Sequence, residues 1–176
     1  MPRITSAVLI ALALALAACG DDPARVFSDL PLVLDGEQPA IPLGVPPGLT
    51  AGHEDDEGGF VELGTGAVIP VIHGPQGGRW LHLAMRATAM RREGQVVVSL
   101  RRDGPDGEVV AAAGHRILLS PTSKGYIEAR DVPVSVPWSD DEIAALVGKP
   151  AHLHLGYEAD DRQASVDLML VFGEDE

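Results

Sequence analysis

The fold is decided by the stretch HLHLGYEADDRQASVDLM, residues 152–169. Apolar and polar side chains alternate on both sides of its two central aspartates, and this period of two is typical of strands with one buried face. If Asp160 and Asp161 form a two-residue turn, the leucines lie on the buried side of a β-hairpin. The cross-strand pairs expected on that side are Leu155 with Val166 and Leu153 with Leu168. A slip of one residue would expose the leucines, so their burial should fix this register.

The same period continues through most of the chain after Gly59. Short runs of branched side chains alternate with glycine and aspartate turns about every 8–12 residues, without the strand–helix alternation of a parallel sheet. The inward-facing side chains are expected to be Leu81, Leu83, Met85 and Ala87 in one strand and Val96, Val98 and Leu100 in the next. Further strands are expected at 108–112, 115–119 and 125–129. The sequence therefore predicts an all-β domain over residues 59–174, an antiparallel β-sandwich of the immunoglobulin-like or a related kind, with about eight or nine strands.

Two local irregularities are predicted within this domain. The apolar parity shifts by one residue near Arg130, which indicates a bulge or a strand break. Pro133 and Pro137 cannot donate to a strand ladder, so this segment should lie at a sheet edge.

One short helix is predicted near residues 140–147. Ser139 has the position of an N-cap, and Glu142 three residues later completes a capping box. Gly148 should end the helix.

The first residues have the features of a secretion signal. Arg3 supplies a positive charge, and the apolar run 7–18 is too short to span a bilayer. The sequence Leu16-Ala17-Ala18-Cys19 resembles the lipobox of bacterial lipoprotein precursors. That resemblance implies removal of residues 1–18, attachment of diacylglycerol and an acyl chain such as palmitate to Cys19, and a lipid bilayer as partner. Gly20 after the cysteine, in place of aspartate, favours the outer membrane of a Gram-negative cell envelope over the inner membrane.

Composition limits the partners further. Cys19 is the only cysteine, so an exported form of this chain has no internal disulfide. The formal net charge is −13, and a phosphate backbone would be repelled, so nucleic acid is not expected as a ligand.

Residues 19–58 are predicted to be a tether that holds the domain away from the membrane. Prolines and glycines are scattered through this segment, which ends in the acidic run Glu54-Asp55-Asp56-Glu57. The run lacks the alternating oxygen ligands and central glycine of a calcium-binding loop.

The outer face of the C-terminal hairpin carries the best candidate site. His152 and His154 should point the same way, roughly 6–7 Å apart, with Asp167 and Met169 opposite them. Asp167 could complete a zinc or copper(II) site, and Met169 would suit copper(I). Alternatively, these are ordinary polar residues, with Asp167 pairing His154. Ser165, His154 and Asp167 could also form a triad, but a flat sheet offers no oxyanion hole.

A second candidate is a basic segment on an acidic protein. No acid occurs between Glu62 and Glu93, whereas this interval contains Arg79, Arg86, Arg91 and Arg92. These arginines could dock an anionic partner, such as a lipid headgroup, an anionic polysaccharide or an acidic patch on an envelope protein. Alternatively, they pair with acids on neighbouring strands.

The stretch Gly74-Pro75-Gln76-Gly77-Gly78 is predicted to be a hairpin loop, because it lacks the lysine and hydroxyl of a P-loop. Together with Phe60-Val61-Glu62-Leu63, it resembles a group of uncharacterised lipoproteins from GC-rich environmental Gram-negative bacteria. That resemblance implies no activity and no ligand.

Two functions are therefore expected from the sequence. The first is a non-enzymatic, membrane-anchored β-sandwich that binds a protein or another envelope component, without a cofactor. The alternative is a periplasmic lipoprotein that binds zinc or copper through His152, His154 and Asp167.

Overall fold

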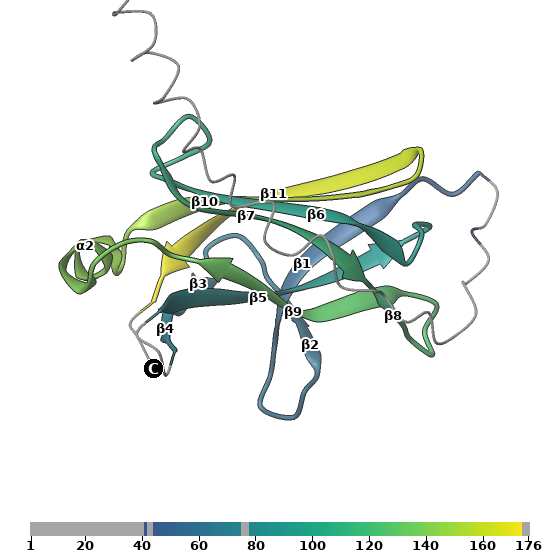
Figure 1. Cartoon of the computed structure of the whole chain (residues 1–176), viewed down its shortest axis with the longest axis horizontal. Helices are drawn as coiled ribbons and strands as arrows, with labels where there is room; N and C mark the ends of the chain where they lie inside the picture. The colour runs from purple at the N-terminus through teal and green to yellow at the C-terminus, as the bar shows by residue number, and fades with distance from the viewer. Residues whose placement is uncertain (1–40, 42–43, 75–77, 174–176) are drawn as a thin grey trace, which may run out of the picture.

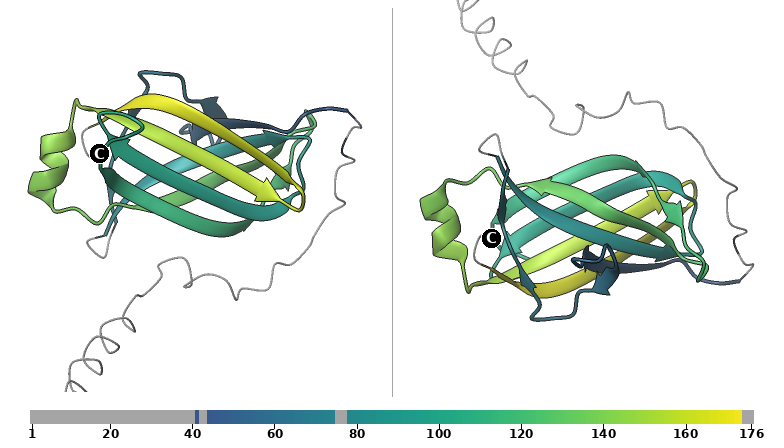
Figure 2. Two further views of the ribbon diagram at one scale, coloured as in Figure 1. Left: turned by 90° about the horizontal axis from the view of Figure 1, so that it is seen from above. Right: turned by 90° about the horizontal axis from the view of Figure 1, so that it is seen from below.

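Two β-sheets pack face to face (Figure 1). The computed structural model describes residue 41 and residues 44–74 and 78–173. Sheet A contains β1 (Gly48–Glu54), β2 (Phe60–Glu62), β4 (Ile72–His73), β5 (Arg79–Thr88), β8 (Ser120–Pro121) and β9 (Ile127–Ser135). Sheet B contains β3 (Val68–Ile69), β6 (Glu93–Arg102), β7 (Val109–Leu118), β10 (Pro150–Ala159) and β11 (Arg162–Phe172). The strands of the two sheets run obliquely across one another (Figure 2).

The strand order confirms the predicted sandwich. Sheet A has the order β2-β1-β5-β9-β8, with β4 beside β5, and sheet B has the order β3-β11-β10-β6-β7. Among the long strands, the first, second and fifth form one sheet, and the seventh, sixth, third and fourth form the other. This is an immunoglobulin-like order in which the fourth long strand lies in the second sheet. The described chain has more strands than predicted. The additional strands include β2, β3, β4 and β8, which are only two or three residues long and therefore too short to show an alternating pattern in the sequence.

The C-terminal hairpin has the predicted register. Leu155 lies opposite Val166, and Leu153 opposite Leu168. Both leucines are 0% exposed, as are the inward-facing residues Leu81, Leu83, Met85, Ala87, Val96, Val98 and Leu100 of β5 and β6. Their burial accounts for the register, because a slip by one residue would move all of them to the outside.

The bulge and the sheet edge are also confirmed. Arg130 and Asp131 of β9 together face the single residue Ala84 of β5, since the register shifts between Leu83 and Met85. On its other side, β9 is bonded only to the short strand β8, at residues 127 and 128, so Pro133 lies on an edge of the described sheet.

The helix α2 (Asp140–Leu146) covers one end of the sandwich (Figure 2). Its capping box is formed as predicted: Ser139 accepts from the Glu142 backbone, and the Glu142 side chain accepts from the Ser139 backbone. Gly148 has a φ of 73°, a left-handed conformation that glycine adopts readily after a helix. No helix in the described part of the chain is long and apolar enough to cross a membrane.

Some predicted boundaries are wrong. The tether was expected to extend to residue 58, but β1 begins at Gly48 and pairs with both β2 and β5, so it belongs to the domain. Its two glycines and three polar residues hide the apolar alternation. The strands expected at 108–112 and 115–119 are the single strand β7. Cys19, the signal segment and the tether up to residue 40 lie outside the described residues, as do residues 75–77 of the glycine-rich loop.

After β2 the chain makes an excursion between the sheets. It crosses to sheet B, where β3 pairs in parallel with β11, and then returns to sheet A as β4 beside β5. This parallel pair departs from the expected antiparallel arrangement. The excursion matters because it forms one wall of the cleft described next.

Candidate functional site

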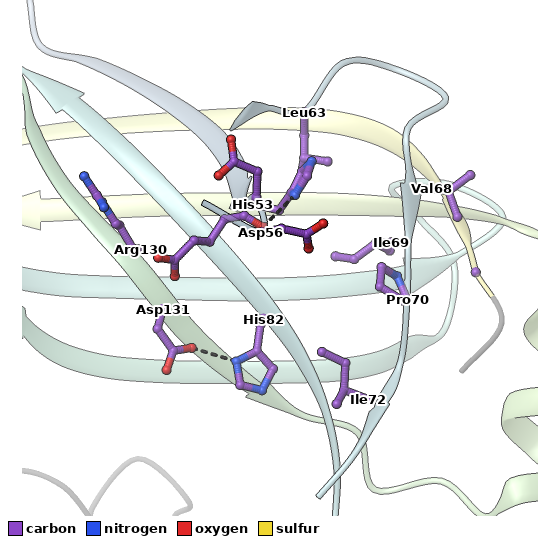
Figure 3. Close-up of a pocket in the computed structure, with 13 residues that line it drawn as sticks. His53, Asp56, Leu63, Val68, Ile69, Pro70, Ile72, His82, Arg130 and Asp131 are labelled. Atoms are coloured by element: carbon purple, nitrogen blue, oxygen red, sulfur yellow. Dashed lines mark hydrogen bonds and ion pairs between the residues drawn. The ribbon is translucent and has the colours of Figure 1, made fainter. Parts of the chain in front are cut away.

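A cleft of about 890 Å³ lies between the β1–β2 hairpin, the segment carrying β3 and β4, and the strands β5 and β9 (Figure 3). The hairpin contributes the polar residues His53, Glu54, Asp55 and Asp56. The strands β5 and β9 contribute His82, Arg130 and Asp131, and the opposite wall is apolar, with Val68, Ile69, Pro70 and Ile72. Leu63 lines the cleft on the side of the hairpin, where its backbone amide donates to Ala51. The cleft is therefore lined by segments far apart in the sequence.

The β9 bulge places a carboxylate beside a histidine in this cleft. Asp131 Oδ1 lies 2.8 Å from His82 Nδ1, a hydrogen bond that leaves the other ring nitrogen of His82 directed away from Asp131 (Figure 3). Both side chains are exposed. Asp131 belongs to the bulge and is a diagonal neighbour of His82, which lies opposite Pro133.

The carboxylates of the hairpin differ in what they bind. Asp55 Oδ1 accepts from the backbone amide of Glu57 at 3.0 Å and from that of Gly59, so this carboxylate holds the hairpin turn together. By contrast, the exposed side chains of Glu54 and Asp56 make no hydrogen bond or ion pair within the described residues.

The single arginine of the cleft is already engaged. Arg130 donates to the carbonyl oxygen of Gly58, and its Nε lies 3.8 Å from Glu128 Oε2 on the same strand. These contacts tie the hairpin to the β9 bulge and compensate part of the positive charge.

The residues predicted for the hairpin site on sheet B lie close together, linked by one hydrogen bond and one ion pair. Asp167 Oδ1 lies 2.9 Å from His154 Nδ1 and 3.3 Å from His152 Nε2, and Met169 lies opposite His152. His152 Nδ1 is buried without a hydrogen-bond partner. Ser165 lies opposite Gly156, two positions along the strands from the pair of His154 and Asp167. Within the described ranges, no three or more His, Cys, Asp and Glu side chains are arranged to hold a metal ion as they stand.

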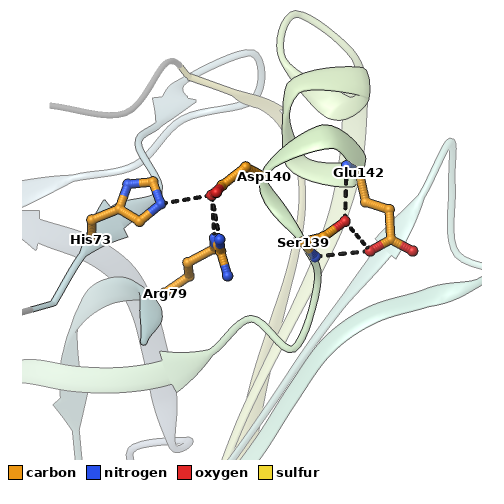
Figure 4. A network of polar contacts seen from close by, with 5 residues as sticks. All are labelled: His73, Arg79, Ser139, Asp140 and Glu142. Atoms are coloured by element: carbon orange, nitrogen blue, oxygen red, sulfur yellow. Dashed lines mark hydrogen bonds and ion pairs between the residues drawn. The ribbon is translucent and has the colours of Figure 1, made fainter. Parts of the chain in front are cut away.

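The four arginines of the basic segment do not share one surface. Arg79 binds Asp140 of α2, with Nε to Oδ1 at 2.8 Å, and His73 Nε2 lies 3.0 Å from the same oxygen (Figure 4). Hydrogen bonds from Arg79 first, and then from His73, hold the pKa of Asp140 below its usual value. Arg91, next to the β10–β11 turn, lies 3.4 Å from Asp160.

The two remaining arginines are partly or wholly enclosed. Arg86 lies between the rings of Phe60 and Tyr126, 4.2 and 4.7 Å from their centroids, and its Nε donates to Glu128 at 2.7 Å. Arg92 is 6% exposed and donates to the carbonyl oxygen of Leu119 at 2.9 Å. The prediction that Arg92 meets a partner is therefore wrong, because its charge is turned into the protein.

The cleft was missed from the sequence because of the tether prediction. With residues 19–58 assigned to a tether, His53 and the acidic run appeared to lie outside the domain. The parity shift near Arg130 was a usable signal, since it predicted the bulge that carries Asp131. Only the three-dimensional excursion through β3 brings the apolar wall to face these residues.

Comparison of the sequence with models of known protein families gives no match, and comparison with curated proteins gives none.

Proposed function

We propose that this chain is a lipid-anchored protein of the cell envelope whose β-sandwich binds a ligand in the cleft and does not catalyse a reaction. The single observation that carries the binding function is the cleft itself: its volume of about 890 Å³ falls within the range of small-molecule sites, and polar and apolar side chains line opposite walls.

A photo-crosslinking amino acid tests the binding function. Val68 lines the cleft and is 62% exposed, whereas Val109, also on a strand of sheet B, is 43% exposed and does not line it. The crosslinker is introduced at either position in the full chain in intact cells, and adduct masses are measured. We expect an adduct at position 68 that is absent at position 109. Equal adducts at both positions, or none at either, would contradict ligand binding in the cleft.

Anchoring is supported by the Leu16-Ala17-Ala18-Cys19 motif and is tested separately. Wild type should incorporate labelled palmitate and lose its first 18 residues, whereas Cys19→Ser should remain unlabelled. Labelling of Cys19→Ser at the wild-type level would overturn the lipid anchor.

A second candidate function is binding of zinc or copper on the outer face of sheet B. One observation favours it: His152 and His154 both face the same oxygen of Asp167. A metal ion would replace the proton shared by His154 and Asp167, after rotation of the side chains. Titration with either metal should show about one bound equivalent and a raised melting temperature.

The matched pair of variants is His154→Ala and His82→Ala. His82 has the same Nδ1-to-carboxylate bond, and Asp131 contacts no second histidine among the described residues. Metal binding should be lost only in His154→Ala. Equal loss in both variants, or no binding to wild type, removes this candidate.

A further inference from the structure

We infer that the ligand of the cleft is an organic cation, an ammonium or guanidinium group joined to an apolar body. This inference rests on the proposed binding function and names the ligand class. Three features of the cleft support it: the negative charge of its lining, two carboxylates without a hydrogen-bond partner among the described residues, and an apolar wall.

The charge of the lining is strongly negative. Four carboxylates, on Glu54, Asp55, Asp56 and Asp131, line the cleft together with one guanidinium, that of Arg130. This guanidinium already donates to Gly58 and lies near Glu128, which is outside the lining. Among the described lining residues no lysine or second arginine is present to receive an anionic ligand, which would meet repulsion, whereas a cation would be attracted into the cleft.

Two of these carboxylates are free to accept hydrogen bonds from a ligand. Asp55 is used by the hairpin turn, and Asp131 is bonded to His82. Glu54 and Asp56 have no side-chain partner within the described part of the protein. An ammonium or guanidinium group donates only, so it matches carboxylates that only accept.

The opposite wall selects a ligand with an apolar part. In Figure 3, Ile69 and Pro70 lie to the right of His53 and Asp56, and Ile72 lies below them, to the right of His82. A bare metal ion or a small polar cation would leave the partly exposed side chains of Pro70 and Ile72 facing water, whereas Ile69 is already buried, at 2% exposed. A hydrocarbon body would cover them while its charged end reached the hairpin acids.

The test uses four small probes with the purified full-length protein in lipid nanodiscs, with empty nanodiscs as the blank. Cyclohexylamine carries both a cation and an apolar body. Cyclohexanol lacks the charge, cyclohexanecarboxylate reverses it, and methylamine lacks the body. Calorimetric titration should show binding of cyclohexylamine at least about tenfold tighter than that of the other three, which corresponds to the cost of losing one favourable contact.

Variants locate the binding. Glu54→Gln with Asp56→Asn should weaken cyclohexylamine binding by about fivefold or more, the effect of removing a unit charge near a cation in water. Glu62→Gln is the matched control, because Glu62 is an exposed acid of the same hairpin that does not line the cleft. It should leave binding unchanged.

The outcomes separate this inference from the proposed function. Equal binding of cyclohexanol or cyclohexanecarboxylate, no binding of cyclohexylamine, or equal loss in the Glu62→Gln control would each overturn the cation as ligand. The proposal that the cleft binds a ligand is tested separately. It would be overturned if the crosslinker at position 68 captured nothing beyond what the crosslinker at position 109 captures.

Discussion

Gly52 lies where two strands and an aromatic ring come together. A Cβ at this position would lie 2.5 Å from the nearest ring carbon of Phe60 and 2.6 Å from the carbonyl oxygen of Val61. The Phe60 ring in turn stacks on Arg86, which pairs with the buried Glu128. Glycine at position 52 therefore lets the β1–β2 hairpin lie close enough to cover this ion pair.

Gly52→Ala should lower the free energy of unfolding by about 1–3 kcal/mol, because ring and backbone must both move away. Urea denaturation measures this loss. Gly64→Ala is the control, since nothing lies within 4 Å of a Cβ there and its φ is not in the left-handed region. Equal losses in the two variants would mean that the close approach at Gly52 has no energetic role.

Tyr157 is a core residue whose hydroxyl is hydrogen-bonded to the backbone. Its hydroxyl lies 2.9 and 3.0 Å from the carbonyl oxygens of Arg91 and Arg92, and its ring is in the core. Burial, and then the charge of Glu93, raise the pKa of Tyr157. The folded state therefore holds this proton more tightly than the unfolded state does, and the stability that results is present below the ordinary tyrosine pKa of about 10 and is lost as the pH rises above it.

Tyr157→Phe should lower the free energy of unfolding by about 1 kcal/mol at neutral pH, through loss of the hydrogen bond. It should also make stability less sensitive to pH above about 10. Urea midpoints for wild type and variant across this range measure both effects. A variant that loses stability with alkaline pH as steeply as wild type would show that Tyr157 is not the group responsible.

The helix α2 is held on the sandwich by several contacts along its length. Its capping box closes the first turn, its buried residues Ile143 and Leu146 face the core, and Asp140 joins it to Arg79 and His73. Because the folded pKa of Asp140 is lowered, this contact stabilises the fold above the ordinary carboxyl pKa of about 4. The contribution is lost as the pH falls through the lower folded value.

Asp140→Asn should therefore destabilise the protein at neutral pH, and the difference from wild type should shrink once the pH falls well below 4 or so. Thermal melting at neutral and acidic pH measures this. Asp141→Asn is the control, because Asp141 also lies in the first turn but has no side-chain partner among the described residues. A difference for Asp140→Asn that persists at acidic pH would contradict the role assigned to its charge.

Elements with strong local signals could be predicted from the sequence. The last hairpin has alternating leucines around a turn, α2 has a capping box, and the β9 bulge follows from a parity shift at Arg130. The strand β1 has no such signal, because Gly48 and Gly52 carry no side chain to alternate, and its pairing partners are distant in the sequence. The cleft depends on β1 and on the crossing of β3 to sheet B, so neither wall could be placed from local pattern alone.

At the scale of the whole molecule, the core defines the domain. Every buried apolar side chain of the described core lies between Ala51 and Phe172, and no disulfide can assist, since Cys19 is the only cysteine. Non-covalent contacts, chiefly the packing of this core, therefore hold the two sheets together. The start of the domain is then set by β1, which pairs with β5 from Gly48 to Gly52.

Two truncated chains test where the domain begins. A chain of residues 44–176 retains β1 and the complete core, so it should melt cooperatively and remain monomeric in size-exclusion chromatography. A chain of residues 59–176 loses β1, which removes Ala51 from the core and leaves β2 and one edge of β5 without their partner strand. Unpaired backbone groups along β5 would favour association with other chains, so this chain should aggregate or lack a cooperative transition. Equal melting of the two chains would show that residues 44–58 belong to the tether after all.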